Sequence, residues 1–123
     1  MTDKIETADK WTEKVNAKDV GAVLELSDHN IELIGPSGSA SAGHDTLAEW
    51  VRNSDITLST KSHYAKGDCV VCEQEATWEH ESGHVMLYTF MEIREGKVHR
   101  IARFDSIDEA FGYCALSERD KVD

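Results

Sequence analysis

The amino-acid sequence predicts one α+β domain, because its first half has helical periodicity and its second half has the alternation of strands. Before Ile56, apolar residues recur mainly every three or four positions. From Ile56 onward, apolar and polar residues alternate. A chain of 123 residues supports one hydrophobic core and is too short for two. We therefore expect a single domain over residues 1–123, ordered as two helices, a strand, a helix, a four-strand meander and a short last helix.

Each helix is predicted from its apolar spacing or its capping residues. An amphipathic helix near residues 3–18 has the apolar positions Ile5, Ala8, Trp11 and Val15. Asp19 can cap a second helix, and a third is expected from about His44. Ser106 and Glu109 have the spacing of a capping box, which predicts the start of the short C-terminal helix.

The most informative stretch is a predicted β-hairpin over residues 85–105. Glu95 and Gly96 fit a two-residue turn, since glycine tolerates positive φ. Regular pairing from this turn puts four pairs on one face: Tyr88 with Arg103, Phe90 with Ile101, Met86 with Asp105, and Glu92 with His99. Apolar walls with a phenol, a guanidinium and a carboxylate are typical of a ligand pocket.

The other face of this hairpin is also predicted to be apolar. An exposed patch of this size is unusual on a monomer, so the sequence predicts a homodimer through this sheet face. The residues of the patch are Leu87, Met91, Ile93, Val98 and Phe104.

The net charge of −11 disfavours nucleic acid and anionic membrane surfaces as partners, because both attract cationic side chains. No stretch has the roughly twenty consecutive apolar residues of a membrane span. The first residues lack the apolar segment of a signal peptide, so a cytoplasmic location is expected.

The cysteines and histidines give weak metal signals. Three cysteines, an odd number, argue against a disulfide framework. Cys69 and Cys72 stand three apart in a predicted strand and should point to opposite faces, which does not suit a zinc site. His80 and His84 flank a turn beside Glu79 and Glu81, where solvated side chains are favoured over metal ligands. No metal or cofactor is expected.

The element order and four short motifs resemble the nuclear transport factor 2-like superfamily, and within it the SnoaL-like and ketosteroid isomerase-like proteins. This resemblance implies a cystatin-like cone, in which a curved antiparallel sheet is wrapped by N-terminal helices around a cavity, and which commonly dimerises through the sheet. The motifs are Asn16-Ala17-Lys18-Asp19, Gly35-Pro36-Ser37-Gly38 with Gly43, Leu47-Ala48-Glu49-Trp50, and Gly96-Lys97-Val98 closing with Phe104-Asp105.

The catalytic residues implied by the resemblance are missing. Trp11, Gly35 and Thr89 stand where ketosteroid isomerases have a tyrosine and two aspartates, so proton shuttling of that design is not expected. Arg103 stands where SnoaL-like cyclases and limonene epoxide hydrolase-like enzymes have a carboxylate. A cation there suits binding or polarising an anionic group.

Three residues are therefore the candidate catalytic group. Arg103 would hold a carboxylate, enolate or phenolate, and Tyr88 would donate a second hydrogen bond. Asp105 would orient Arg103 or act as a base. The alternative is a structural ion pair between Arg103 and Asp105.

Five further residues are predicted to contact a ligand: Trp11, Trp50, Gln74, Phe90 and Ile101. Both tryptophans could equally be core residues, since aromatic residues at helical spacing usually pack. Gln74 is the polar residue on the apolar side of its strand, which suits hydrogen bonding to a ligand.

Two functions remain open. The first is a small-molecule cavity protein that binds or transforms a small, partly apolar metabolite with an anionic or carbonyl group, by isomerase, dehydratase or hydrolase chemistry if it is an enzyme. The second is a non-catalytic dimerisation or accessory domain with a vestigial pocket. An open pocket favours the first, and an interior filled by Trp11 and Trp50 favours the second.

Overall fold

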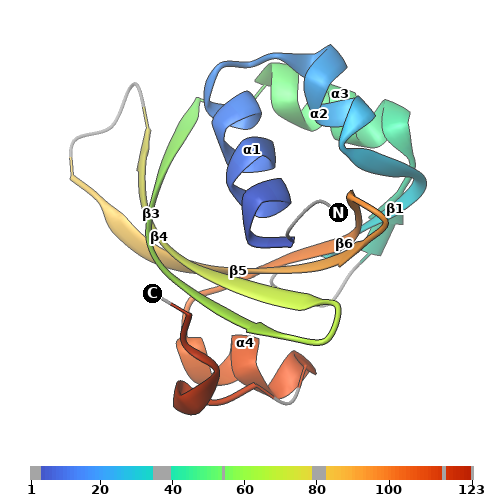
Figure 1. Cartoon of the computed structure of the whole chain (residues 1–123). Coiled ribbons are helices and arrows are strands. Elements are labelled where there is room, and N and C mark those ends of the chain that lie inside the picture. Colours follow the sequence, from blue (N-terminus) through green and yellow to red (C-terminus); the bar gives the residue numbers. More distant parts are fainter. Residues whose placement is uncertain (1–3, 35–39, 54, 79–82, 115, 123) are drawn as a thin grey trace.

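The computed structural model of the protein describes residues 4–34, 40–53, 55–78, 83–114 and 116–122, without the side chains of residues 40–42 and 114. Within these ranges the elements follow the predicted order, with one extra strand and a final 3₁₀ helix. Helix α1 (Lys4–Asn16) lies within the curve of the sheet, and α2 (Val20–Glu25) and α3 (His44–Asn53) cover the same side (Figure 1). Helix α4 (Ile107–Cys114) and η1 (Glu118–Asp120) lie on the opposite side (Figure 1). The α+β prediction is confirmed.

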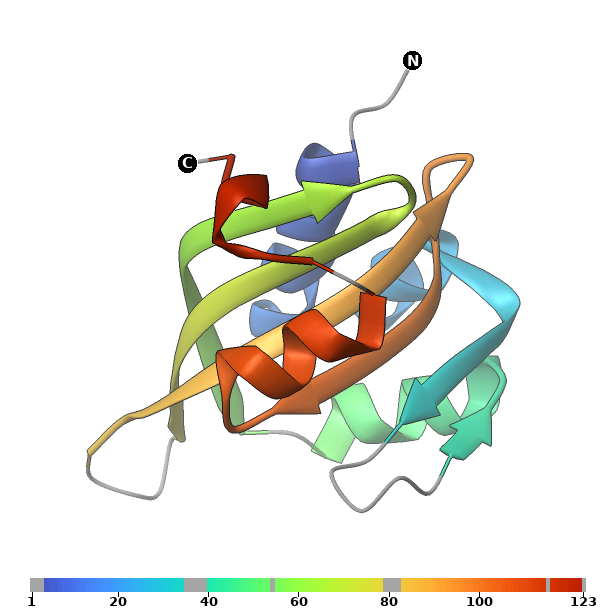
Figure 2. The ribbon, with the colours of Figure 1, turned by 90° about the horizontal axis from the view of Figure 1, so that it is seen from below.

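Six strands form one curved sheet in the order β2-β1-β6-β5-β4-β3. Neighbouring strands are antiparallel except β1 and β6, which run parallel, so the predicted antiparallel sheet is in fact mixed. We call the side that faces α1 the inner face and the side that faces α4 the outer face; α4 lies across the outer face (Figure 2). The strands are β1 (Ser27–Ile34), β2 (Ala40–Ala42), β3 (Ile56–Lys66), β4 (Cys69–Trp78), β5 (Val85–Arg94) and β6 (Lys97–Phe104).

The β5–β6 turn is as predicted, but the register beyond it is not. Glu95 (φ 54°) and Gly96 (φ 74°) both have positive φ, as a type I′ turn requires, and Arg94 pairs with Lys97. The register then shifts between Ile93, which pairs with Val98, and Glu92, which pairs with Arg100. His99 is thus the extra residue of a β-bulge.

This bulge puts every later side chain of β6 on the face opposite that of its predicted partner in β5. Arg103 pairs with Thr89 instead of Tyr88, and Ile101 pairs with Met91 instead of Phe90. Because side chains alternate along a strand, a shift of one residue exchanges the two faces. The predicted cluster of Tyr88, Phe90, Ile101 and Arg103 on one face is therefore wrong.

Both faces of the hairpin are covered within this chain. Met91, Ile93, Val98 and Ile101 are buried on the inner face in one core cluster with Trp11 and Val51. On the outer face, Phe90 and Ala102 pack in a second cluster with Phe111 of α4. The apolar patch from which the dimer was predicted is thus largely internal, and that argument no longer supports a dimer.

A second bulge changes the face of the residues at the end of β3. The β3–β4 register shifts between Thr60 and Ser62, which leaves Lys61 as the extra residue. His63 consequently pairs with Cys72, whose side chain belongs to the inner core, and Tyr64 pairs with Val71 in the outer cluster. With regular alternation, Tyr64 would instead lie on the same side as Ile56 and Leu58.

Strand β3 is one of the two edges of the sheet, and two other segments cover parts of it. The Asn16 side chain at the end of α1 donates from Nδ2 to the Leu58 carbonyl oxygen at 2.8 Å. Its Oδ1 accepts from the Leu58 N–H, also at 2.8 Å. Further along the strand, the Val122 N–H donates to the carbonyl oxygen of His63 at 2.8 Å. Side-chain and terminal groups thus take the place of a seventh strand at these positions.

Two remaining predictions concern cysteines and membrane helices. Cys69 is disulfide-bonded, contrary to the expectation from the odd number of cysteines, whereas Cys72 is buried and is not disulfide-bonded. The side chain of Cys114 lies outside the description. Among the described residues, none of the helices is long and apolar enough to span a membrane.

Candidate functional site

The structure separates the three residues predicted to act together. Arg103 lies on the inner face, opposite Thr89. Tyr88 lies on the outer face, where it packs against the cluster under α4. Asp105 follows the end of β6 and is exposed. No ion pair joins Arg103 to Asp105 in the part of the chain that the structure describes. One site cannot contain all three side chains in this arrangement.

The Arg103 guanidinium packs against Trp50 of helix α3. Its Cζ atom lies 4.5 Å from the centroid of the Trp50 ring, which is cation–π geometry. The Nε and Nη2 atoms are buried and have no hydrogen-bond partner among the described residues. Burial lowers the pKa of Arg103 to about 10, so the side chain is still charged at neutral pH.

Trp11 and Trp50 lie side by side within the cone, with their ring centroids 6.3 Å apart and their planes at 20°. Trp11 is fully buried, and its Nε1 donates to the Ser27 hydroxyl at 3.0 Å. That hydroxyl donates in turn to the Val23 carbonyl oxygen at 2.7 Å. Trp50 is only partly buried. Trp11 is therefore a core residue, and Trp50 separates it from Arg103.

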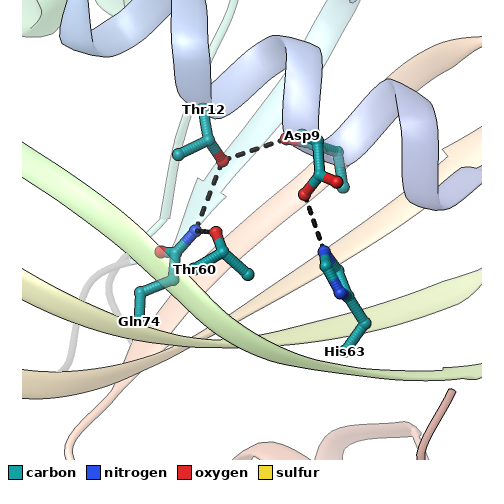
Figure 3. A network of polar contacts seen from close by, with 6 residues as sticks. Asp9, Thr12, Thr60, His63 and Gln74 are labelled. Carbon is teal, nitrogen blue, oxygen red and sulfur yellow. Dashed lines mark hydrogen bonds and ion pairs between the residues drawn. The ribbon is translucent and has the colours of Figure 1, made fainter. Parts of the chain in front are cut away.

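Gln74 is at the centre of a buried network between α1 and the sheet (Figure 3). Its Nε2 donates to the hydroxyls of Thr12 at 3.3 Å and Thr60 at 3.2 Å. Its Oε1 accepts from the Thr89 hydroxyl at 2.7 Å. Both amide protons and the carbonyl oxygen are thus used by the protein itself. Gln74 does point into the cone, as predicted, but the protein supplies its partners.

Sequence reasoning missed a polar pair beside this network. His63 is buried on β3, and its Nε2 lies 2.7 Å from Oδ1 of Asp9 on α1 (Figure 3). The polar sequence context of His63 predicts an exposed side chain, but the bulge at Lys61 turns it to the inner face. The presence of Asp9 one helical turn before Thr12 was the available signal, since residues three apart share a helix face.

The two remaining predicted ligand contacts lie on opposite faces. Ile101 is buried on the inner face in the cluster that contains Trp11. Phe90 lies on the outer face, where its ring centroid is 4.8 Å from that of Tyr113 on α4. Phe90 is therefore remote from Arg103 and Trp50.

No metal site is found in the described ranges, where no three histidine, cysteine or acidic side chains are close enough to hold an ion. The suggested ligands Glu79, His80 and Glu81 lie outside the described residues. Among the described residues, the group with buried and unused donors is the Arg103 guanidinium, which lies beside an aromatic ring. Such a group can bind an anion, and it is a poor base because it stays protonated.

A curved mixed sheet with one helix within its curve and two more over the same side defines the fold class of this chain (Figure 1). Solved structures place the chain in the nuclear transport factor 2-like fold of this class. An NTF2-like protein of unknown function from Cytophaga hutchinsonii matches with a TM-score of 0.76 at 9% identity, over 90% of this chain and 96% of that one. The predicted cone with N-terminal helices is confirmed at the level of the fold.

Two further neighbours have functional descriptions. One is a candidate ketosteroid isomerase from Kribbella flavida, with a TM-score of 0.71 and 18% identity, over 80% of this chain and 73% of that one. The other is a computationally designed 17-OHP binder, with a TM-score of 0.71 and 16% identity, over 85% of this chain and 91% of that one. At such identities the likeness shows the fold alone. Sequence comparison finds no matching family model and no matching curated protein.

Proposed function

We propose that this protein binds a small, partly apolar molecule with an anionic group at the Arg103–Trp50 end of the cone. The observation that carries the proposal is the Arg103 guanidinium, whose Nε and Nη2 are buried without a partner in the described structure. A buried charge without a partner is costly, so such groups usually serve a ligand or a reaction. The fold neighbours that bind or are assigned to act on small molecules support this use of the fold.

The proposed role is binding, without general acid–base catalysis by Tyr88 or Asp105. Tyr88 is on the outer face and Asp105 is exposed, so neither is within reach of an anion held by Arg103. The inner-face groups nearest in register, Thr89 and Gln74, are hydrogen-bonded to each other. An isomerase, dehydratase or hydrolase would need a base that this end of the cone does not offer among its described residues.

The alternative is an accessory domain with a vestigial pocket. A specific observation favours it, because Trp11 and Gln74 are fully buried and fill the middle of the cone. A ligand would then lie at the Trp50 end, where the tryptophan is partly buried. The two functions therefore differ in whether Arg103 responds to added anions.

The test is a thermal-shift screen of small aromatic and aliphatic acids, each paired with its neutral amide. The proteins are wild type, Arg103→Ala and the control Arg100→Ala; Arg100 is exposed on the same strand and pairs with Glu32 at 3.3 Å. We expect acids to raise the Tm of wild type and of Arg100→Ala, and to have little effect on Arg103→Ala. Equal stabilisation of all three proteins would reject Arg103 as the anchor. No response from any acid would support the accessory domain.

A homodimer through the sheet face and a cytoplasmic location remain proposals. The outer face of β5 and β6 is covered by α4 (Figure 2). A dimer would therefore have to use α4 itself, where Tyr113 is 42% exposed. Light scattering of the purified protein at micromolar concentration decides between monomer and dimer, and Tyr113→Ser should dissociate a dimer of this kind.

A further inference from the structure

We propose that the anion recognised at this site is a carboxylate, bound side-on to the Nε and Nη2 atoms of Arg103. This inference rests on the proposed function, and it names the ligand class of the same site. It excludes an enolate or a phenolate, which an arginine side chain in general could also bind.

The pattern of unused donors carries the inference. Nε and Nη2 lie along the same edge of the planar guanidinium, and their N–H bonds point in parallel directions. Both are buried and unpaired within the described structure, so one whole edge of the group lacks an acceptor. A carboxylate has two oxygens with matching separation and accepts both hydrogen bonds at once. An enolate or phenolate has one oxygen and leaves one donor unpaired.

The ring of Trp50 restricts how the ligand can approach. Because the Trp50 ring lies 4.5 Å from Cζ of Arg103, it blocks approach to the guanidinium from that side, and a ligand has to reach the donors past it. Nε and Nη2 are closed to solvent, so the ligand must also shift the partly buried Trp50 side chain. Binding should therefore change tryptophan emission.

No protein carboxylate competes for this edge among the described residues. The nearest acidic residue in sequence, Asp105, is exposed, and Glu32 is paired with Arg100. The cross-strand partner of Arg103 is Thr89, whose hydroxyl is donated to Gln74. With a net charge of −11, the chain has many carboxylates but uses none here.

The experiment measures the affinities of four probes by calorimetry near neutral pH. Benzoate and hexanoate present a carboxylate, benzamide is the neutral isostere of benzoate, and pentafluorophenolate is an anion with one oxygen. The proteins are wild type, Arg103→Lys, Trp50→Phe and the control Arg100→Lys. Lysine keeps the charge but has no planar edge with two parallel donors.

We expect the carboxylates to bind wild type about tenfold or more tightly than either other probe. Arg103→Lys should lose about tenfold or more in carboxylate affinity and leave pentafluorophenolate nearly unchanged, while Arg100→Lys behaves as wild type. Benzoate should change the tryptophan emission of wild type, and Trp50→Phe should remove that change.

The unfavourable outcomes are distinguishable. If pentafluorophenolate binds as tightly as benzoate and Arg103→Lys keeps both, the site recognises charge alone, so the carboxylate inference fails while the proposed function stands. If benzamide equals benzoate and only Trp50→Phe weakens them, an apolar site remains without an anion requirement, which also overturns the inference. If no probe binds at millimolar concentration, the inference and the proposed function both fail.

Discussion

The guanidinium of Arg103 lies 4.5 Å from the ring of Trp50 and has no carboxylate partner among the described residues. A cation–π contact of this kind contributes about 0.5–2 kcal/mol. That is less than the cost of leaving a buried charge without hydrogen bonds. The unliganded protein therefore carries a local instability at this position, and an anion would relieve it.

Replacing Arg103 with leucine should stabilise the unliganded protein by about 1–3 kcal/mol, because the buried charge is removed without opening a large cavity. Arg103→Ala should be less stable than Arg103→Leu, because it does leave a cavity. Urea unfolding of both variants, with Arg100→Leu as the surface control, measures this order. Lower stability of Arg103→Leu than of wild type would show that the arginine is stabilising as it stands.

The same difference should depend on pH in a defined direction. Burial lowers the pKa of Arg103 to about 10 in the folded protein, below the ordinary value of an arginine. The unfolded chain therefore holds this proton more tightly, and the penalty is fully present below the folded pKa. The penalty fades as the pH rises through about 10 towards the higher pKa of the unfolded chain. The advantage of Arg103→Leu over wild type should be constant near neutral pH and shrink above about pH 9.

Gln74→Met should destabilise the protein by about 1–3 kcal/mol, because it leaves the buried Thr89 hydroxyl without its acceptor. Adding Thr89→Val removes that hydroxyl, so the double variant should cost less than the sum of the two single changes. Chemical unfolding of the four proteins gives the coupling. Additive costs would mean that Gln74 contributes only packing.

The two stacked tryptophans should differ sharply in their importance for stability. Trp11→Ala should cost about 3–5 kcal/mol, because Trp11 is fully buried and bonded to Ser27. Trp50→Ala should cost less, since Trp50 is partly buried. Denaturant unfolding measures both, and equal costs would place Trp50 in the core and weaken the case for a ligand there.

Asn16→Ala should destabilise the protein by about 1–2 kcal/mol, through the loss of its two hydrogen bonds to Leu58. It should also increase aggregation, because it exposes backbone groups of the edge strand. Asn53→Ala, an exposed asparagine at the end of α3, is the control. Unfolding and time-resolved light scattering are the measurements. Unchanged aggregation would mean that the edge is protected by other means.

The helices, the strand order along the chain and the β5–β6 turn were predictable from local signals. Capping by Asp19 is an example, since its Oδ1 accepts from the Ala22 N–H at 3.2 Å. The composition of the candidate site was not predictable, because two bulges change which side chains share a face. Neither bulge is marked by a glycine or proline in the sequence. Regular alternation therefore predicts uninterrupted pairing through both His99 and Lys61. The contact of Arg103 with Trp50 depends on the bulge at His99, and the contact of His63 with Asp9 depends on the bulge at Lys61.

The bulge at His99 makes the interior of this fold sensitive to changes in chain length. Deleting His99 would remove the extra residue and keep Arg103 opposite Thr89. Deleting Ala102 instead would turn Arg103 to the outer face and bring Phe104 inside, without substituting a single residue. A single insertion or deletion in this strand can thus replace a cationic side chain on the inner face with an aromatic one. Relatives with nearly the same residues could for this reason select ligands of opposite character.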